Sequence, residues 1–210
     1  VVDQCPTCAA NDLALTPADA ATLLGRDGVV LGPGDAELLV DRTEGWPAGL
    51  RLAALFLARG EPGRGPADFG GDDHAVVEYL VEEVLACYDP PMQQFLLRTS
   101  VAERLNASLA EELSGQPQGQ QHLEELAASN TFVVGLGSNG AWFRYHALLR
   151  QMLRHRLSVE SPDVVPELHR RAAHWFSDQG QPVEALRHAA DAQDWDLLGR
   201  LLVTEALPLV

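Results

Sequence analysis

One short segment near the middle of the chain, residues 131–145, differs in hydrophobic pattern from everything around it. Residues 131–136 and 141–145 are short runs rich in β-branched and aromatic side chains, which are typical of strands. Between them lies Gly-Ser-Asn-Gly, whose Asn-Gly step favours the tight turn of a β-hairpin. The other patterned segments have a helical period, so the sequence predicts a mainly α fold with one β-hairpin.

The segments beside the hairpin predict a winged helix. Helices are expected from about Pro90, from Asn106 to Gly115 and over residues 119–130, and they immediately precede the two strands. Helix, helix, helix, hairpin is the element order of a winged-helix domain. A long amphipathic helix over residues 147–160 closes the unit, with these apolar residues on its inner face: Leu148, Leu149, Met152, Leu153 and Leu157.

The first third of the chain predicts short helices with well-marked starts. Thr16 and Pro17 are suited to the cap and first position of one helix, which we expect to stop at Gly25. A second helix is expected over residues 35–43. A third begins at Pro47, because proline has no N–H to leave without a partner in a first turn. This third helix is apolar on nearly every face, which predicts burial, and the N–H groups at its start must meet a turn, another segment or a ligand.

The last third predicts closely packed antiparallel helices. Breaks are expected at Gly180 and near Asp194, and small residues recur between aromatic ones, as close helix stacking requires. We therefore divide the chain into an uncertain N-terminal segment (1–12), a small helical lid domain (13–72), a winged-helix domain (73–160) and a helical arm that begins a repeat-like array (161–210).

Charge limits the function classes. The formal net charge is −15, and all 15 basic residues are Arg, so the chain contains no P-loop of the form GxxxxGK[ST], which needs a Lys. The helix over 119–130 would read DNA in a winged helix, yet it carries Glu124 and Glu125 and no Arg. Since phosphate neutralisation supplies much of the affinity for DNA, we expect no direct DNA binding, despite the strip formed by Arg144, Arg150, Arg154 and Arg156.

Targeting signals are not apparent in the sequence. No run approaches the roughly 20 apolar residues of a membrane span, and no charged-then-apolar leader opens the chain. We expect a cytoplasmic protein without membrane contact. The first residues are Val-Val rather than Met, and we expect the chain to be part of a longer protein.

Few side chains suggest chemistry. Cys5 and Cys8 have the spacing of half a zinc site, but no further ligand lies near them in sequence, so we interpret them as an ordinary pair and expect no metal. No catalytic residue can be assigned, and the chain alone is not expected to be an enzyme. Most histidines fit surface or half-buried helix positions. His146 differs, because it lies between the second strand and the following helix.

Six segments in fixed order resemble one family, the MalT-like LuxR group of ATP-dependent transcription activators within the STAND class of signalling NTPases. The resemblance covers the chain from about Leu13 to its end and rests on these segments: residues 42–55, 79–85, 95–101, 123–133, 142–157 and 168–196.

The resemblance implies a layout and a ligand. Family members have an N-terminal P-loop domain, then lid, winged-helix and arm domains, then a superhelical sensor and a C-terminal DNA-binding domain. This chain resembles the middle part, so the other domains are its expected partners, with self-association possible for the whole protein. Gly45, Trp46 and Pro47 match the Gly-x-Pro motif, whose proline packs against adenine, and His146 matches a histidine that contacts the ADP β-phosphate. ADP or ATP is thus expected in the full-length protein, and no tightly bound cofactor in this chain alone.

Four interpretations follow. The first is a regulatory segment that couples the ADP or ATP state to domain rearrangement and self-assembly. The second is a helical protein-interaction module that binds neither nucleotide nor DNA, in which Pro47 only begins a helix and His146 only occupies a corner. A DNA-binding winged helix and a zinc or redox protein built on Cys5 and Cys8 complete the alternatives.

Overall fold

The computed structural model describes residues 14–58, 65–129, 132–137 and 141–206. The fold is mainly α with one small antiparallel sheet, as predicted. The chain forms two compact units, Val1–Val84 with His146–Met152, and Leu85–Tyr145 with Leu153–Val210. Within the described ranges, no helix combines the length and the apolarity needed to cross a membrane.

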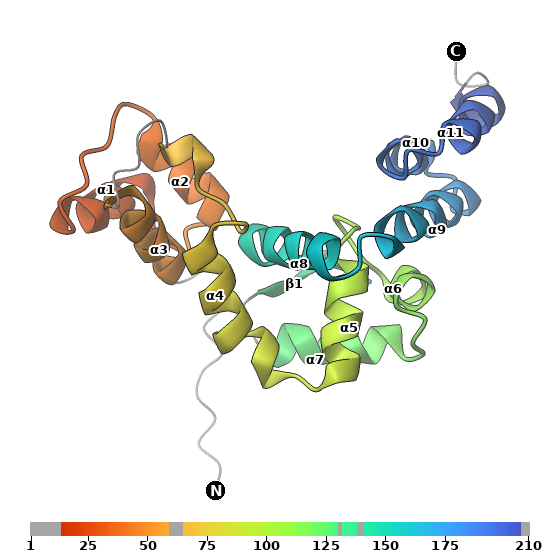
Figure 1. Ribbon diagram of the computed structural model, residues 1–210, viewed down its shortest axis with the longest axis horizontal. Coiled ribbons are helices and arrows are strands. Elements are labelled where there is room, and N and C mark those ends of the chain that lie inside the picture. The colour runs from red at the N-terminus through yellow and green to blue at the C-terminus, as the bar shows by residue number, and fades with distance from the viewer. Residues whose placement is uncertain (1–13, 59–64, 130–131, 138–140, 207–210) are drawn as a thin grey trace, which may run out of the picture. The chain divides into compact units, whose positions relative to one another are not determined.

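The first unit is built from short helices whose ends are fixed by local residues (Figure 1). It contains α1 (Pro17–Arg26), α2 (Asp35–Thr43), α3 (Pro47–Ala58), the short turn η2 (Pro66–Asp68), α4 (His74–Glu83) and the first residues of α8 (Ala147–Glu160). Thr16 caps α1 in a reciprocal pair with Asp19, so the predicted start is confirmed. The predicted stop at Gly25 is wrong, because α1 continues to Arg26 and the left-handed turn residue is Gly28.

The second unit holds the winged helix. Its elements are η3 (Leu85–Cys87), α5 (Pro90–Thr99), α6 (Ala107–Ser114), α7 (Gly119–Ser129), β1 (Val133–Leu136), β2 (Trp142–Tyr145) and the rest of α8. The strands pair antiparallel, from Val133 opposite Tyr145 to Leu136 opposite Trp142. Leu105 adds a further bridge to Phe143. The predicted Asn139-Gly140 turn lies outside the described residues.

The predicted inner face of α8 is confirmed. Its five apolar residues are each at most 3% exposed: Leu148, Leu149, Met152, Leu153 and Leu157. The boundary between the two units falls inside this helix, after Met152. Leu148, Leu149 and Met152 therefore belong to the first unit, and Leu153 and Leu157 to the second.

The arm follows with α9 (Val164–Asp178), α10 (Pro182–Asp191), α11 (Trp195–Leu201) and the final turn η4 (Leu202–Ala206). Helices α9 and α10 lie side by side (Figure 1). Four alanines allow this close approach and are fully buried: Ala172, Ala173, Ala185 and Ala189. The predicted breaks are confirmed, since Gly180 has a positive φ and Asp194 caps α11.

Candidate functional site

The turn between α2 and α3 requires glycine at one position. Gly45 has a φ of 70°, and its carbonyl accepts a hydrogen bond of 2.8 Å from the N–H of Leu15. A Cβ at Gly45 would lie 2.8 Å from the Leu15 carbonyl oxygen. The left-handed φ and this close approach both exclude a side chain, so the segment before α1 is held firmly against the turn.

The start of α3 has the predicted form. The carbonyl of Trp46 accepts from the N–H of Leu50 at 2.9 Å, and Pro47 occupies the first helical position, where its ring is exposed. The Trp46 ring lies 5.8 Å, centroid to centroid, from both Tyr79 and His146. Gly49 makes room for it, because a Cβ there would lie 2.6 Å from the indole.

His146 is buried at the corner between β2 and α8, with 6% of its surface exposed. Its Nε2 lies 2.8 Å from the carbonyl oxygen of Thr43, and the N–H of Leu148 donates to its Nδ1 at 3.3 Å. A carbonyl only accepts and a backbone N–H only donates. With these partners, Nε2 is the ring nitrogen that donates and Nδ1 is the one that accepts.

Glu44 provides a second connection to the same corner. Its carboxylate Oε1 accepts from the N–H of Ala147 at 2.9 Å, which satisfies a free donor at the start of α8 and places a negative charge at the positive end of that helix. We call the contacts of Thr43, Glu44 and Trp46 with His146 and Ala147 the lid joint. All of its residues belong to the first compact unit.

The next turn of α8 is held in the same unit by Gln151. Its side-chain Oε1 accepts from the N–H of Gly71 at 2.7 Å. A Cβ at Gly71 would lie only 2.2 Å from the Leu148 carbonyl oxygen, so this approach also requires glycine. The first two turns of α8 are thus fixed against two separate loops.

The structure therefore brings the sequence-predicted site residues to one place. Gly45 shapes the turn, Trp46 contacts His146, and Pro47 lies next to them at the surface. Sequence reasoning missed Thr43 and Glu44, whose partners lie 103 residues away. No local pattern marks such contacts, and only the coordinates show them.

Other sequence-based expectations have different outcomes. Cys5 and Cys8 lie outside the described residues. Among the residues that are described, no group of three or more His, Cys, Asp or Glu side chains is arranged to hold a metal ion. His155 and His174 are exposed, as predicted, whereas the prediction is wrong for His169 and His188, which are buried at 2% and 1% exposure and contact each other.

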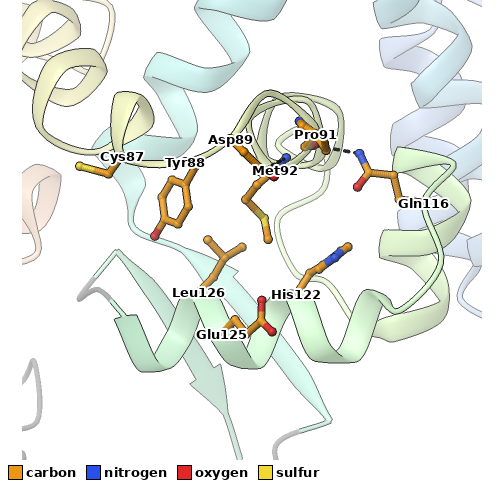
Figure 2. A pocket seen from close by; sticks show the side chains of 9 residues that line it. All are labelled: Cys87, Tyr88, Asp89, Pro91, Met92, Gln116, His122, Glu125 and Leu126. Carbon is orange, nitrogen blue, oxygen red and sulfur yellow. Dashed lines mark hydrogen bonds between the residues drawn. The ribbon is translucent and has the colours of Figure 1, made fainter.

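A separate cavity of about 410 Å³ lies in the winged helix. Figure 2 shows Tyr88, Met92 and Leu126 turned toward this space, with His122 and Glu125 of α7 at its edge. The amide of Gln116 donates to the Pro91 carbonyl at 2.9 Å beside it. None of the four predicted site residues lines this cavity, so it is distinct from the lid joint.

The outer face of α7 carries glutamates that bond within the helix. Gln120 donates to Glu124 and Gln121 to Glu125, both at 2.7 Å. This face therefore presents amide–carboxylate pairs and no guanidinium. The expectation that this chain does not itself bind DNA stays a prediction.

Comparison with known proteins identifies relatives. Residues 81–165 match the family described as the MalT winged helix domain. The HTH-type transcriptional regulator MalT of Yersinia enterocolitica is 36% identical over 187 residues, which are 88% of this chain and 21% of that protein. MalT of Serratia proteamaculans is 35% identical over 83% of this chain and 20% of its own length.

A relative with a different name matches equally well. The serine/threonine-protein kinase PknK of Mycobacterium tuberculosis is 37% identical over 176 residues, which are 83% of this chain and 16% of that protein. The chain thus spans between 16% and 21% of the length of these curated relatives.

Proposed function

Because the chain belongs to the MalT family of transcriptional regulators, through a winged helix domain at residues 81–165, we propose that it is the regulatory middle segment of a nucleotide-switched activator. In this proposal the segment acts in the cytoplasm, performs no catalysis and couples the ADP or ATP state of a neighbouring P-loop domain to domain rearrangement and self-assembly. The observation that carries the proposal is the lid joint, which links the Gly45-Trp46-Pro47 turn directly to His146.

Pro47 is the proposed adenine contact. Its ring is exposed and rigid, and the turn before it is held by the hydrogen bond from the Leu15 N–H to the Gly45 carbonyl. A flat base can pack on such a surface without requiring any side chain to lose freedom. Trp46 points instead toward His146 and Tyr79, so in this proposal it positions the turn and does not touch the base.

His146 is the proposed phosphate contact, and its two nitrogens have different tasks. Nε2 lies 2.8 Å from the Thr43 carbonyl oxygen, and in this proposal Nδ1 is the atom that contacts a phosphate. The present partner of Nδ1 is the Leu148 N–H at 3.3 Å, a longer bond than the one to Thr43. If the ring takes up a second proton, on Nδ1, one phosphate oxygen can accept both from Nδ1 and from this N–H at the start of α8.

The consequence is a switch by population shift. A nucleotide bound at Pro47 and His146 would favour the conformation in which the lid joint is closed, because the joint places both contacts correctly. Release of the nucleotide, or its exchange, would remove that preference. The shift is limited by the difference in affinity between the two conformations.

The proposal is tested by ADP affinity in the full-length protein that carries this chain. Pro47→Ala and His146→Ala are each expected to weaken ADP binding about tenfold, corresponding to the loss of about 1.4 kcal/mol. Pro90→Ala is the matched control for Pro47, since Pro90 is also an exposed proline at the first position of a helix. It should leave ADP affinity unchanged.

His146→Gln separates the two tasks of the imidazole. A glutamine Nε2 can still donate to the Thr43 carbonyl, but it offers no counterpart of Nδ1. We expect this variant to keep the stability of the lid while losing ADP affinity, whereas His146→Ala loses both. Unchanged ADP affinity in Pro47→Ala and His146→Ala alike would contradict the nucleotide proposal.

That outcome would favour the second candidate, a helical protein-interaction module. One observation supports it: the same segment is matched in a regulator named for transcription and in a protein named as a kinase. If one segment occurs in proteins named for two different activities, we expect its own function to be one that both proteins can use. Partner binding would be such a function, as would the nucleotide switch.

A further inference from the structure

Helices α9 and α10 enclose two histidines that the nucleotide proposal does not use. His169 on α9 is 2% exposed and His188 on α10 is 1% exposed. Their Nδ1 atoms lie 2.9 Å apart, a hydrogen-bond distance. Phe176 stacks on the His188 ring at 5.3 Å with 14° between the planes, so this ring is held in one orientation.

The short contact between identical atoms limits how many protons the pair can hold. One Nδ1 must donate and the other must accept, so a single proton lies between the rings. If one ring gains a proton on its Nε2, the shared bond survives. If both rings become charged, two N–H groups point at each other and two buried positive charges are brought together.

The charged neighbours come from several elements. Asp191 on α10 places a carboxylate oxygen 3.7 Å from Nδ1 of His169, which favours one positive charge on the pair. Arg170, the next residue on α9, contacts Glu167 and Asp194. On the packed neighbours, α6 carries Glu111, bonded to the Gly119 N–H, and exposed Glu112, while α11 carries Asp196.

We propose that His169 and His188 form a hydrogen-bonded imidazole pair between α9 and α10 that can take up only one extra proton. This limit makes the stability of the helical arm sensitive to acidification. The folded arm accepts at most one extra proton at this pair, whereas the unfolded chain accepts one on each imidazole, with an ordinary pKa of about 6.5. Because the unfolded state then binds more protons, the stability of the arm falls as the pH decreases below that range.

The test is the pH dependence of urea unfolding of the 210-residue chain, followed by far-UV circular dichroism from pH 8 to pH 5. A difference of one bound proton makes the folding equilibrium constant fall about tenfold per pH unit. We expect the wild-type chain to show this extra slope below about pH 6 relative to His188→Asn. Asparagine can accept from His169 without carrying a charge.

His174→Asn is the matched control, because His174 is an exposed histidine on the same helix α9. It should keep the wild-type slope. Parallel curves for the wild-type chain and His188→Asn would overturn the proposal. So would a rise in the wild-type unfolding midpoint on adding zinc that is absent in His188→Asn, since the pair would then be a metal site.

A second readout applies if His188→Asn does not fold. The ring Cε1–H resonances of the wild-type chain should show at most one of His169 and His188 titrating before the chain unfolds in acid, while His174 titrates freely. Independent titration of both buried rings in the folded chain would contradict the proposed limit of one extra proton.

Discussion

The His146 ring forms hydrogen bonds with two backbone groups, the Thr43 carbonyl and the Leu148 N–H, in addition to its contact with the Trp46 ring. Backbone partners keep their chemistry whatever side chain replaces the residue that carries them. The lid joint and the turn beside it therefore depend on the identity of only a few residues, those whose side chain or backbone φ no other residue type reproduces. Gly45 and His146 are two of these positions.

Gly45→Ala is expected to lower the free energy of unfolding by about 2 kcal/mol, because it combines left-handed strain with a clash against Leu15. Gly28→Ala is the control, since Gly28 has a φ of 78° but nothing within 4 Å of an added Cβ. It should cost about 1 kcal/mol from strain alone. Equal losses in urea unfolding would show that the contact with Leu15 is looser than the 2.8 Å distance implies.

Tyr145 should make the chain sensitive to alkali. Burial raises the pKa of its hydroxyl above the ordinary value of 10.0, although the hydrogen bond with Thr99 acts in the opposite direction. The unfolded chain releases this proton above about pH 10, while the folded chain retains it. The contribution to stability is thus complete below that pH and is lost as the pH rises further.

Tyr145→Phe tests this assignment, with Tyr79→Phe as the control because Tyr79 is 37% exposed. At neutral pH we expect Tyr145→Phe to cost about 1 kcal/mol, from the lost 2.6 Å bond to Thr99. Above pH 10 its stability should fall less steeply than that of the wild type. An unchanged alkaline slope in Tyr145→Phe would contradict this account.

At the scale of helices and strands, the features set by adjacent residues could be predicted from the sequence. Asn106 caps α6 and Gly115 ends it in the left-handed conformation, and α8 spans the predicted residues. The failures involve residues far apart in the chain. The His169–His188 bond joins two helices, and neither helix pattern distinguishes a buried imidazole from a half-exposed one. The contact between His146 and Thr43 could not be predicted either, because these residues lie 103 positions apart in the chain.

The winged helix and the arm are joined by a charged residue on an aromatic face. Arg104 lies 5.0 Å from the centroid of the Trp142 ring, and it donates to Gln181 at 2.8 Å and to Glu184 at 2.9 Å. Arg187 pairs with Glu103 at 3.0 Å in the same region. The two arginines are equally exposed, at 44% of the side chain, so they form a matched pair.

Arg104→Ala is therefore expected to destabilise the chain by about 1 kcal/mol, mostly through the lost contact with Trp142. Arg187→Ala should cost less than about 0.5 kcal/mol, since an exposed ion pair contributes little. Thermal unfolding of the two variants at low and high salt measures both effects. A larger loss in Arg187→Ala would show that simple charge pairing, and not the stacked guanidinium, joins the arm to the winged helix.

At the scale of the whole molecule, the chain covers about a fifth of its relatives, and its sequence contains no lysine for a P-loop. We expect the purified 210-residue chain to hydrolyse no ATP above the buffer background in a phosphate-release assay with magnesium. Turnover that follows the chain through successive purification steps would contradict a purely regulatory role.

In the proposed function, the lid joint presents Pro47 and His146 to one nucleotide. A crystal structure of the full-length protein with ADP tests it most directly. The account predicts adenine packed on the Pro47 ring, a phosphate oxygen within hydrogen-bond distance of His146 Nδ1, and an intact bond from His146 Nε2 to the Thr43 carbonyl. ADP bound with neither residue in contact, while the lid joint is unchanged, would contradict it.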